Sequence, residues 1–182
     1  MNAIPVVSIF GSSRPRPGDE EYIMAYEVGL ELARAGFVVC TGGYAGIMEA
    51  ASKGAKDAGG RTIGVISDVF PEKKPNQWVD EVIVADSLVN RLLKLMTLGE
   101  AYVVLKGGTG TLLEFAAVWE FMNKRLMQEK PIVLVGSFWS GVVGTLSQEL
   151  QWEGLGDATR YITVTGSARE CAGFLREKHG IS

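Results

Sequence analysis

A glycine-rich segment that ends in a carboxylate is the part of the sequence best suited to chemistry. Residues 106–114 read Lys-Gly-Gly-Thr-Gly-Thr-Leu-Leu-Glu and follow an apolar run that is typical of a buried strand. Glycines let the backbone approach a ligand, and the first amides of a helix carry a partial positive charge. Threonine hydroxyls add further donors. The segment therefore predicts a phosphate-binding turn made of Gly107, Gly108, Thr109, Gly110 and Thr111.

The same turn also has a purely structural interpretation. Glycine-rich turns between a strand and a helix are common, and this one is not a Walker A loop, because no Lys-Ser/Thr pair follows its glycines. We expect the helix to begin at about Thr111, which puts Glu114 in its first turn. There Glu114 either meets the substrate beside its phosphate or only complements the helix dipole. The spacing alone leaves both alternatives open.

Arg91 is the candidate partner of Glu114. The sequence places it near the start of the preceding helix, where a positive charge opposes the helix dipole. A guanidinium in that position is free to bind a phosphate or a carboxylate instead. Arg91 and Glu114 are therefore the candidate catalytic residues.

Two more glycine-rich turns follow predicted strands. The first reads Gly-Ser-Ser-Arg, so it lacks the dinucleotide fingerprint, and the second permits close approach of a nucleotide. The candidates for nucleotide binding that these turns supply are Gly11, Ser12, Ser13, Gly42, Gly43, Gly46 and Met48. Three charged neighbours are possible additions. Arg14 closes over an anion or is a solvated loop charge, Glu49 lines the cleft or complements its helix, and Lys106 precedes the phosphate turn.

The elements that must position these turns follow from the hydrophobic pattern. Short apolar runs predict strands at 6–10, 37–41, 61–66, 81–85, 101–105, 132–135 and 161–164. Helical spacing predicts helices at 20–35, 47–58, 88–98, 111–125, 138–150 and 168–178. The polar segment 67–80 predicts a loop. This alternation favours one α/β domain over residues 1–182, with a doubly wound, mostly parallel sheet and helices on both faces. Ligands bind such sheets beyond the carboxyl ends of the strands, where the three turns lie.

Composition excludes several classes of function. The 182 residues carry a net charge of −3, which argues against a broad nucleic-acid surface. The first residues lack the features of a signal peptide, and no apolar run is long enough to span a bilayer. Cys40 and Cys171 are typical of buried thiols in a reducing compartment, so we expect a cytoplasmic protein. With one histidine, His179, and two cysteines far apart in the sequence, we expect no metal site and no Cys-His catalytic pair.

Taken together, the motifs resemble the LOG (Lonely Guy) family, long misnamed lysine decarboxylases. The family hallmark P-G-G-x-G-T-x-x-E corresponds to residues 106–114, and the family's arginine, fifteen residues before the motif, is Arg91. The segments 11–13 and 42–48 are similar too. The resemblance implies a Rossmann-like fold, a homodimer, a nucleoside monophosphate ligand such as AMP, and no cofactor.

In the enzymes of this family, the resemblance further implies hydrolysis of the N-glycosidic bond of AMP or a cytokinin riboside monophosphate. The products are the free base and ribose 5-phosphate. Glu114 would stabilise the oxocarbenium character of the ribose or orient water, and Arg91 would hold Glu114 or the nucleotide.

The chain also departs from the family pattern. Lys106 replaces the hallmark proline, Leu92 replaces a lysine, and Tyr44 and Glu49 stand where the plant-type enzymes carry small residues. These features are similar to a broader bacterial branch that also resembles molybdenum-cofactor carrier proteins. The alternative function is therefore a non-catalytic nucleotide-binding or molybdenum-cofactor carrier protein. DNA binding by a related domain is disfavoured by the charge, and nothing independent supports a pyridoxal-dependent decarboxylase.

Overall fold

The predicted elements form in the expected order. The computed structural model describes residues 4–70, 72 and 74–181. Its strands are β1 (Val6–Phe10), β2 (Val38–Thr41), β3 (Thr62–Ser67), β4 (Glu81–Ala85), β5 (Ala101–Val104), β6 (Ile132–Val135) and β7 (Ile162–Thr165). Its helices are α1 (Glu20–Arg34), α2 (Ile47–Asp57), α3 (Leu88–Leu98), α4 (Thr109–Asn123), α5 (Ser140–Trp152) and α6 (Ala168–Lys178).

One parallel sheet organises the chain. The strand order is β4-β3-β2-β1-β5-β6-β7, and every neighbouring pair is parallel, so the mostly parallel prediction is confirmed and extended. The chain runs outward from β1 to β4 and then returns to place β5 on the other side of β1. The topological switch point of the sheet thus lies between β1 and β5, and ligands bind at such points in open parallel sheets.

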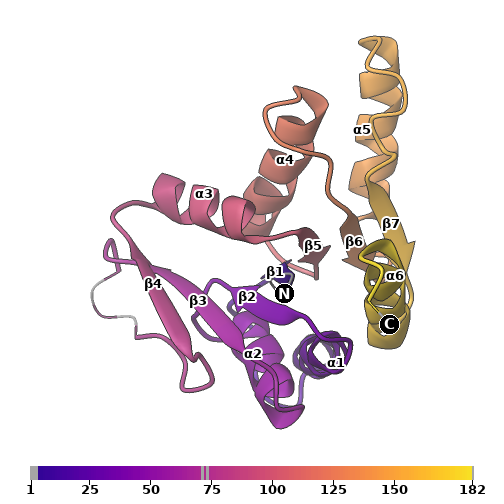
Figure 1. Cartoon of the computed structure of the whole chain (residues 1–182). Coiled ribbons are helices and arrows are strands. Elements are labelled where there is room, and N and C mark those ends of the chain that lie inside the picture. Colours follow the sequence, from indigo (N-terminus) through magenta and orange to yellow (C-terminus); the bar gives the residue numbers. More distant parts are fainter. Residues whose placement is uncertain (1–3, 71, 73, 182) are drawn as a thin grey trace.

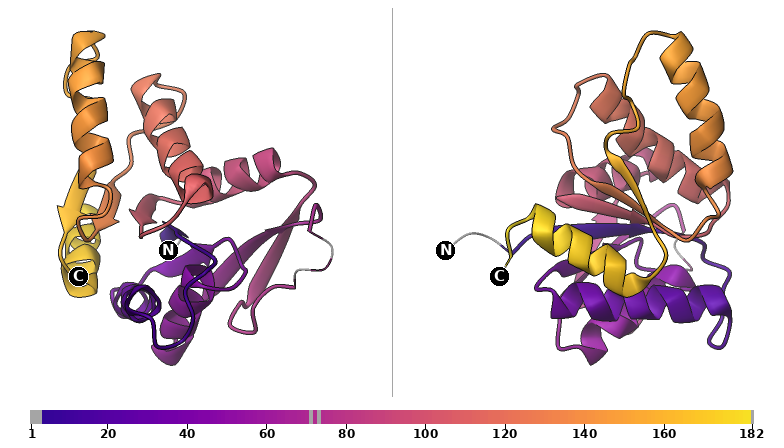
Figure 2. Two further views of the ribbon diagram at one scale, coloured as in Figure 1. Left: turned by 180° about the vertical axis from the view of Figure 1, so that it is seen from behind. Right: turned by 90° about the vertical axis from the view of Figure 1, so that its right-hand side faces the viewer.

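Helices cover both faces of this sheet, each over its own hydrophobic core. Figures 1 and 2 show α1, α2 and α6 on one face and α3, α4 and α5 on the other. Cys171 belongs to the first core and Cys40 to the second, and both are buried free thiols. The cytoplasmic location that we inferred from these cysteines stays a prediction. Among the helices of the described residues, none has the length and apolar character that a membrane crossing needs.

Direct hydrogen bonds join the three glycine-rich turns at the carboxyl edge of the sheet. The backbone N–H of Ser12 donates to the carbonyl of Lys106 (3.2 Å), and that of Ile47 donates to the carbonyl of Ser12 (2.9 Å). Gly46 has φ +70°, and a Cβ there would lie 2.5 Å from the Ser12 carbonyl oxygen. Only glycine allows both this conformation and this close approach. The turns therefore form one surface rather than three separate loops.

Several boundaries differ from the sequence prediction by one or two residues, and two of these differences bear on the site. Ser67 belongs to β3 rather than to the following loop, because β3 pairs with β4 as far as Ala85. Helix α4 begins at Thr109 instead of Thr111, with Gly108 as its N-cap residue. The hydrogen bond from Leu112 N–H to the Gly108 carbonyl (2.9 Å) closes its first turn. The low helix propensity of Gly110 concealed this turn in the sequence.

Candidate active site

A pocket of about 320 Å³ opens where the three turns meet. Its lining comes from the segments that follow β1, β2 and β3 and from α2, α3 and α4. The lining residues are Gly11, Ser12, Ser13, Tyr44, Met48, Phe70, Arg91, Gly108, Thr109, Gly110, Thr111 and Glu114. The volume lies near the lower end of the range for small-molecule sites, which is roughly 300–1,000 Å³.

Arg91 is held in the pocket by two backbone carbonyls. Its Nε donates to the carbonyl of Val65 (2.7 Å), and its Nη2 donates to the carbonyl of Gly42 (3.1 Å). The guanidinium carbon lies 5.5 Å from the centre of the Tyr44 ring. A Cβ on residue 42 would lie 1.8 Å from Nη2, so glycine at this position makes room for the arginine. Arg91 is therefore fixed before any ligand arrives.

The remaining guanidinium nitrogen faces Glu114. Nη1 of Arg91 lies 3.6 Å from Oε1 of Glu114, and the two side chains are only 14% and 16% exposed. Burial raises the pKa of Glu114 to about 7, and the positive charge of Arg91 opposes part of that rise. Near neutral pH the carboxyl group is thus present in both protonation states, as a general acid or base requires.

The position of Glu114 on α4 argues against one of its two sequence interpretations. Because α4 begins at Thr109, its first turn contains no acidic residue, and Glu114 lies in the second turn. Helix-dipole effects fall off within the first turn, so complementing the dipole does not account for this carboxylate. No acidic side chain in the first turn of α4 compensates the positive end of the helix dipole, and this end borders the pocket.

In the third glycine-rich turn, the fold requires glycine at one position but not at the two others. A Cβ on Gly107 would lie 2.1 Å from Oγ1 of Thr111, so packing demands glycine there. A Cβ on Gly108 or Gly110 would meet no atom within 4 Å, and neither residue has positive φ. Neither packing nor backbone conformation therefore explains Gly108 and Gly110, which both line the pocket.

The other predicted glycines have a structural role in the turns around the pocket. Gly42, Gly43, Gly46 and Gly107 are not among its lining residues. Gly43 has φ +74°, and its N–H donates to Oγ1 of Thr41 (3.1 Å). These glycines shape the turns that present Ser12, Ser13 and Met48.

The three charged candidates are not among the residues that line the pocket. Nζ of Lys106 contacts Oε1 of Glu21 on α1 at 2.5 Å, and Lys106 lines a neighbouring groove together with Arg14. The charge of Glu49 instead affects Tyr22 of α1, whose pKa it raises in addition to the larger effect of burial. The structure thus does not place Lys106, Arg14 or Glu49 beside Glu114.

Sequence reasoning missed two aromatic residues of the lining. The hydroxyl of Tyr44 donates to the carbonyl of Ser67 (3.2 Å) and accepts from its N–H (2.9 Å). The Tyr44 ring stands edge-on to Phe70, with the ring centres 6.3 Å apart. The place of Tyr44 inside the second glycine-rich turn was an available signal. Phe70 follows β3 in a loop, and no sequence pattern pointed to it.

Comparison with known proteins places the chain in a family. A sequence model of the SLOG cluster4 family matches residues 4–164. The chain belongs to the SLOG cluster4 family. An uncharacterized protein of Archaeoglobus fulgidus is 34% identical over 119 residues, which cover 64% of this chain and 76% of that protein. The cytokinin riboside 5′-monophosphate phosphoribohydrolase of Mycobacterium tuberculosis is 34% identical over 116 residues, covering 62% and 60% of the two chains.

Among solved structures, the molybdenum cofactor binding protein of Rippkaea orientalis matches this SLOG cluster4 protein with a TM-score of 0.76. It is 26% identical, and the match covers 97% of this chain and 98% of that one. The match to the Mycobacterium tuberculosis enzyme, in contrast, spans less than two thirds of that enzyme's length. These findings confirm the resemblance to LOG proteins and the Rossmann-like fold that it implied.

The raised pKa of Glu114 predicts how pH affects stability. Its ordinary value is 4.5 and its folded value is about 7, so ionisation opposes folding as pH rises through that interval. We expect the stability of the wild type relative to Glu114→Gln to fall by on the order of 3 kcal/mol between these pH values. Urea unfolding of both proteins at pH 4.5 and pH 8 measures this change. A stability difference that is the same at both pH values contradicts it.

Proposed function

We propose that the protein is a nucleoside 5′-monophosphate phosphoribohydrolase. It would hydrolyse the N-glycosidic bond of AMP or a cytokinin riboside monophosphate and release the free base and ribose 5-phosphate. The observation that carries this proposal is the buried Arg91–Glu114 pair, which shares one pocket with the start of α4. The Mycobacterium tuberculosis relative is a cytokinin riboside 5′-monophosphate phosphoribohydrolase, which supports the same reaction class.

The start of α4 suits the phosphate of such a ligand. Backbone N–H groups of its first turn have no partner within the helix and carry the positive end of the dipole. Thr109 and Thr111, which both carry a hydroxyl, are also lining residues. A phosphate that rests against the backbone explains why positions 108 and 110 lack side chains that the fold would tolerate. Binding at this point fixes the ribose relative to Glu114.

Glu114 and Arg91 suit the chemical step. As the base departs, its bonding electrons leave with it and positive charge develops on the ribose. The ionised carboxylate of Glu114 would stabilise that charge and accept a proton from the attacking water, whose oxygen forms the new bond to the ribose. That proton would then pass to the departed base, which is released in its neutral form and leaves the carboxylate ionised again. Arg91 keeps the carboxylate in place and favours its ionised form. Because backbone carbonyls already orient Arg91, little reorganisation accompanies the reaction.

Hydrolysis of AMP tests this proposal directly. We expect the pure protein to release adenine from AMP and Glu114→Gln to lower kcat by about 10²–10⁴-fold, the usual contribution of a general acid or base. Glu120→Gln is the matched control, because Glu120 lies on the same helix but is exposed and pairs with Lys124. Chromatography of the released base measures the rates. Equal rates for wild type and Glu114→Gln would sink the proposal.

A second candidate function has its own support. The similarity to the molybdenum cofactor binding protein extends over 97% of the chain, and Tyr44 and Phe70 give the pocket an aromatic wall. Both features favour a non-catalytic carrier of a phosphorylated, ring-containing ligand, such as molybdenum cofactor. Absence of adenine release, together with a bound pterin or nucleotide in native mass spectrometry, would select this function over hydrolysis.

Gly110→Ala separates phosphate binding from folding. The substitution adds a methyl group that meets no protein atom within 4 Å, and alanine favours the helix by up to about 1 kcal/mol over glycine. We therefore expect an equal or higher Tm. If phosphate lies against this backbone, KM for AMP rises roughly tenfold or more, the cost of a disturbed charged hydrogen bond. An unchanged KM would place the phosphate elsewhere.

We also infer a homodimer, which the LOG resemblance implies. Helices α3 and α4, on the same face of the sheet, expose the apolar side chains of Leu88, Val89, Leu93 and Leu113. An interface between subunits would cover such exposed apolar side chains. Sedimentation equilibrium at micromolar concentration measures the assembly. We expect a dimer, and a monomer would contradict the inference.

A further inference from the structure

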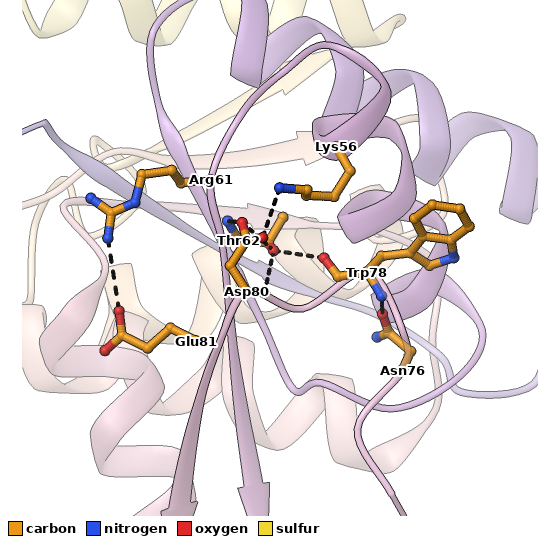
Figure 3. A network of polar contacts seen from close by, with 7 residues as sticks. All are labelled: Lys56, Arg61, Thr62, Asn76, Trp78, Asp80 and Glu81. Carbon is orange, nitrogen blue, oxygen red and sulfur yellow. Dashed lines mark hydrogen bonds and ion pairs between the residues drawn. The ribbon is translucent and has the colours of Figure 1, made fainter.

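The crossover from β3 to β4 contains no helix among its described residues, so polar contacts hold it in place. At its end, the carboxylate of Asp80 accepts hydrogen bonds from the N–H of Thr62 (2.9 Å) and from Nζ of Lys56 (2.7 Å). The hydroxyl of Thr62 donates to the carbonyl of Trp78 (2.6 Å) and accepts from the N–H of Asp80 (2.9 Å). Figure 3 shows this network, which ties the crossover to β3 and α2.

The same network fixes the side chain of Asn76. Its Oδ1 accepts a hydrogen bond from the N–H of Trp78 (3.0 Å), as Figure 3 shows. Because Oδ1 is thus engaged, Nδ2 is the group that faces the second glycine-rich turn. Nδ2 donates to the carbonyls of Gly43 (3.1 Å) and Tyr44 (2.9 Å), and the backbone N–H of Asn76 also donates to Gly43 (2.8 Å). One residue therefore satisfies two successive carbonyls of the turn.

The turn held by Asn76 is the one that holds the catalytic arginine. The carbonyl of Gly42 accepts from Nη2 of Arg91, and the Tyr44 ring lies beside the same guanidinium. Asn76 is part-buried and does not line the pocket. Among the side-chain hydrogen bonds of the described residues, none joins Asn76 to Arg91 or Glu114, so any influence on them passes through the 42–44 backbone.

We propose that Asn76 is a positioning residue, which holds the Gly42–Tyr44 backbone so that Arg91 faces Glu114. This inference rests on the proposed hydrolase function and goes beyond it. The site thus depends on a crossover segment that lies outside the three glycine-rich turns. Asn76 acts on the geometry of the pair, whereas the phosphate contacts at the start of α4 do not involve it.

The variant Asn76→Asp isolates this role. An aspartate keeps the oxygen that accepts from Trp78, but it loses both donated hydrogen bonds and turns a negative oxygen toward two carbonyls. We expect kcat for AMP to fall about 10–100-fold, as expected for a small displacement of catalytic groups. KM is expected to stay unchanged, because the phosphate contacts are untouched.

Lys56→Met is the matched control for a merely structural role. It removes the contact with Asp80 at the opposite end of the same network and leaves the hydrogen bonds of Asn76 in place. We expect it to lower Tm and keep the wild-type kcat. Asn76→Ala removes the two bonds that the side chain donates and also the acceptor of the Trp78 N–H, without adding a charge, and it replaces Asn76→Asp if that variant does not fold. A wild-type kcat in the folded Asn76 variant, or an equal fall in kcat in Lys56→Met, would overturn the proposal.

A crystal structure of the Asn76 variant separates this inference from the proposed function. If the wild type does not release adenine, the hydrolase proposal fails, but the positioning role is still decided by geometry. We expect the 42–44 backbone to shift and the hydrogen bond from Arg91 Nη2 to Gly42 to be lost. A turn and an arginine that superpose on the wild type would overturn the positioning role, whatever the activity.

Discussion

The site depends on one constraint, the anchoring of a buried guanidinium by backbone carbonyls. Val65 at β3 and Gly42 after β2 accept from Nε and Nη2 of Arg91, which leaves Nη1 to face Glu114. Two neighbouring parallel strands thus fix a charge at the carboxyl edge of the sheet. A buried charge is costly unless it is paired and hydrogen-bonded, and here the fold itself supplies most of the partners. The arginine is therefore part of the scaffold and of the site.

That anchoring sets the chemistry of the carboxyl group. At 3.6 Å, the Arg91–Glu114 contact is longer than a hydrogen bond, and burial outweighs the attraction of the arginine. The pKa of Glu114 is therefore near 7, whereas a close bidentate pair would keep the carboxylate ionised. The positive end of α4 has no acid in its first turn, which suits the anion that the proposed function places there. The Arg91–Glu114 pair and the start of α4 thus have different roles in the proposed site.

Much of this arrangement follows from the sequence, and the rest needs tertiary contacts. The alternation of strands and helices places the turns at one edge, and the family pattern pairs Arg91 with Glu114. The anchoring of Arg91 is not, because it joins residues far apart in the chain through main-chain carbonyls that carry no sequence signal. The orientation of Lys106 depends equally on Glu21, a residue of another element. Phe70 reaches the pocket from a loop without periodicity.

The central claim is that one pocket holds a phosphate on α4 and a glycosidic bond beside Glu114. A crystal structure of Glu114→Gln with bound AMP tests it most directly, because the slowed reaction preserves the ligand. The account predicts the phosphate against the amides of residues 108–111 and the anomeric carbon next to the side chain of residue 114, with Arg91 still bonded to Gly42 and Val65. A phosphate in the neighbouring groove at Lys106 and Arg14, with the ribose remote from residue 114, would contradict it.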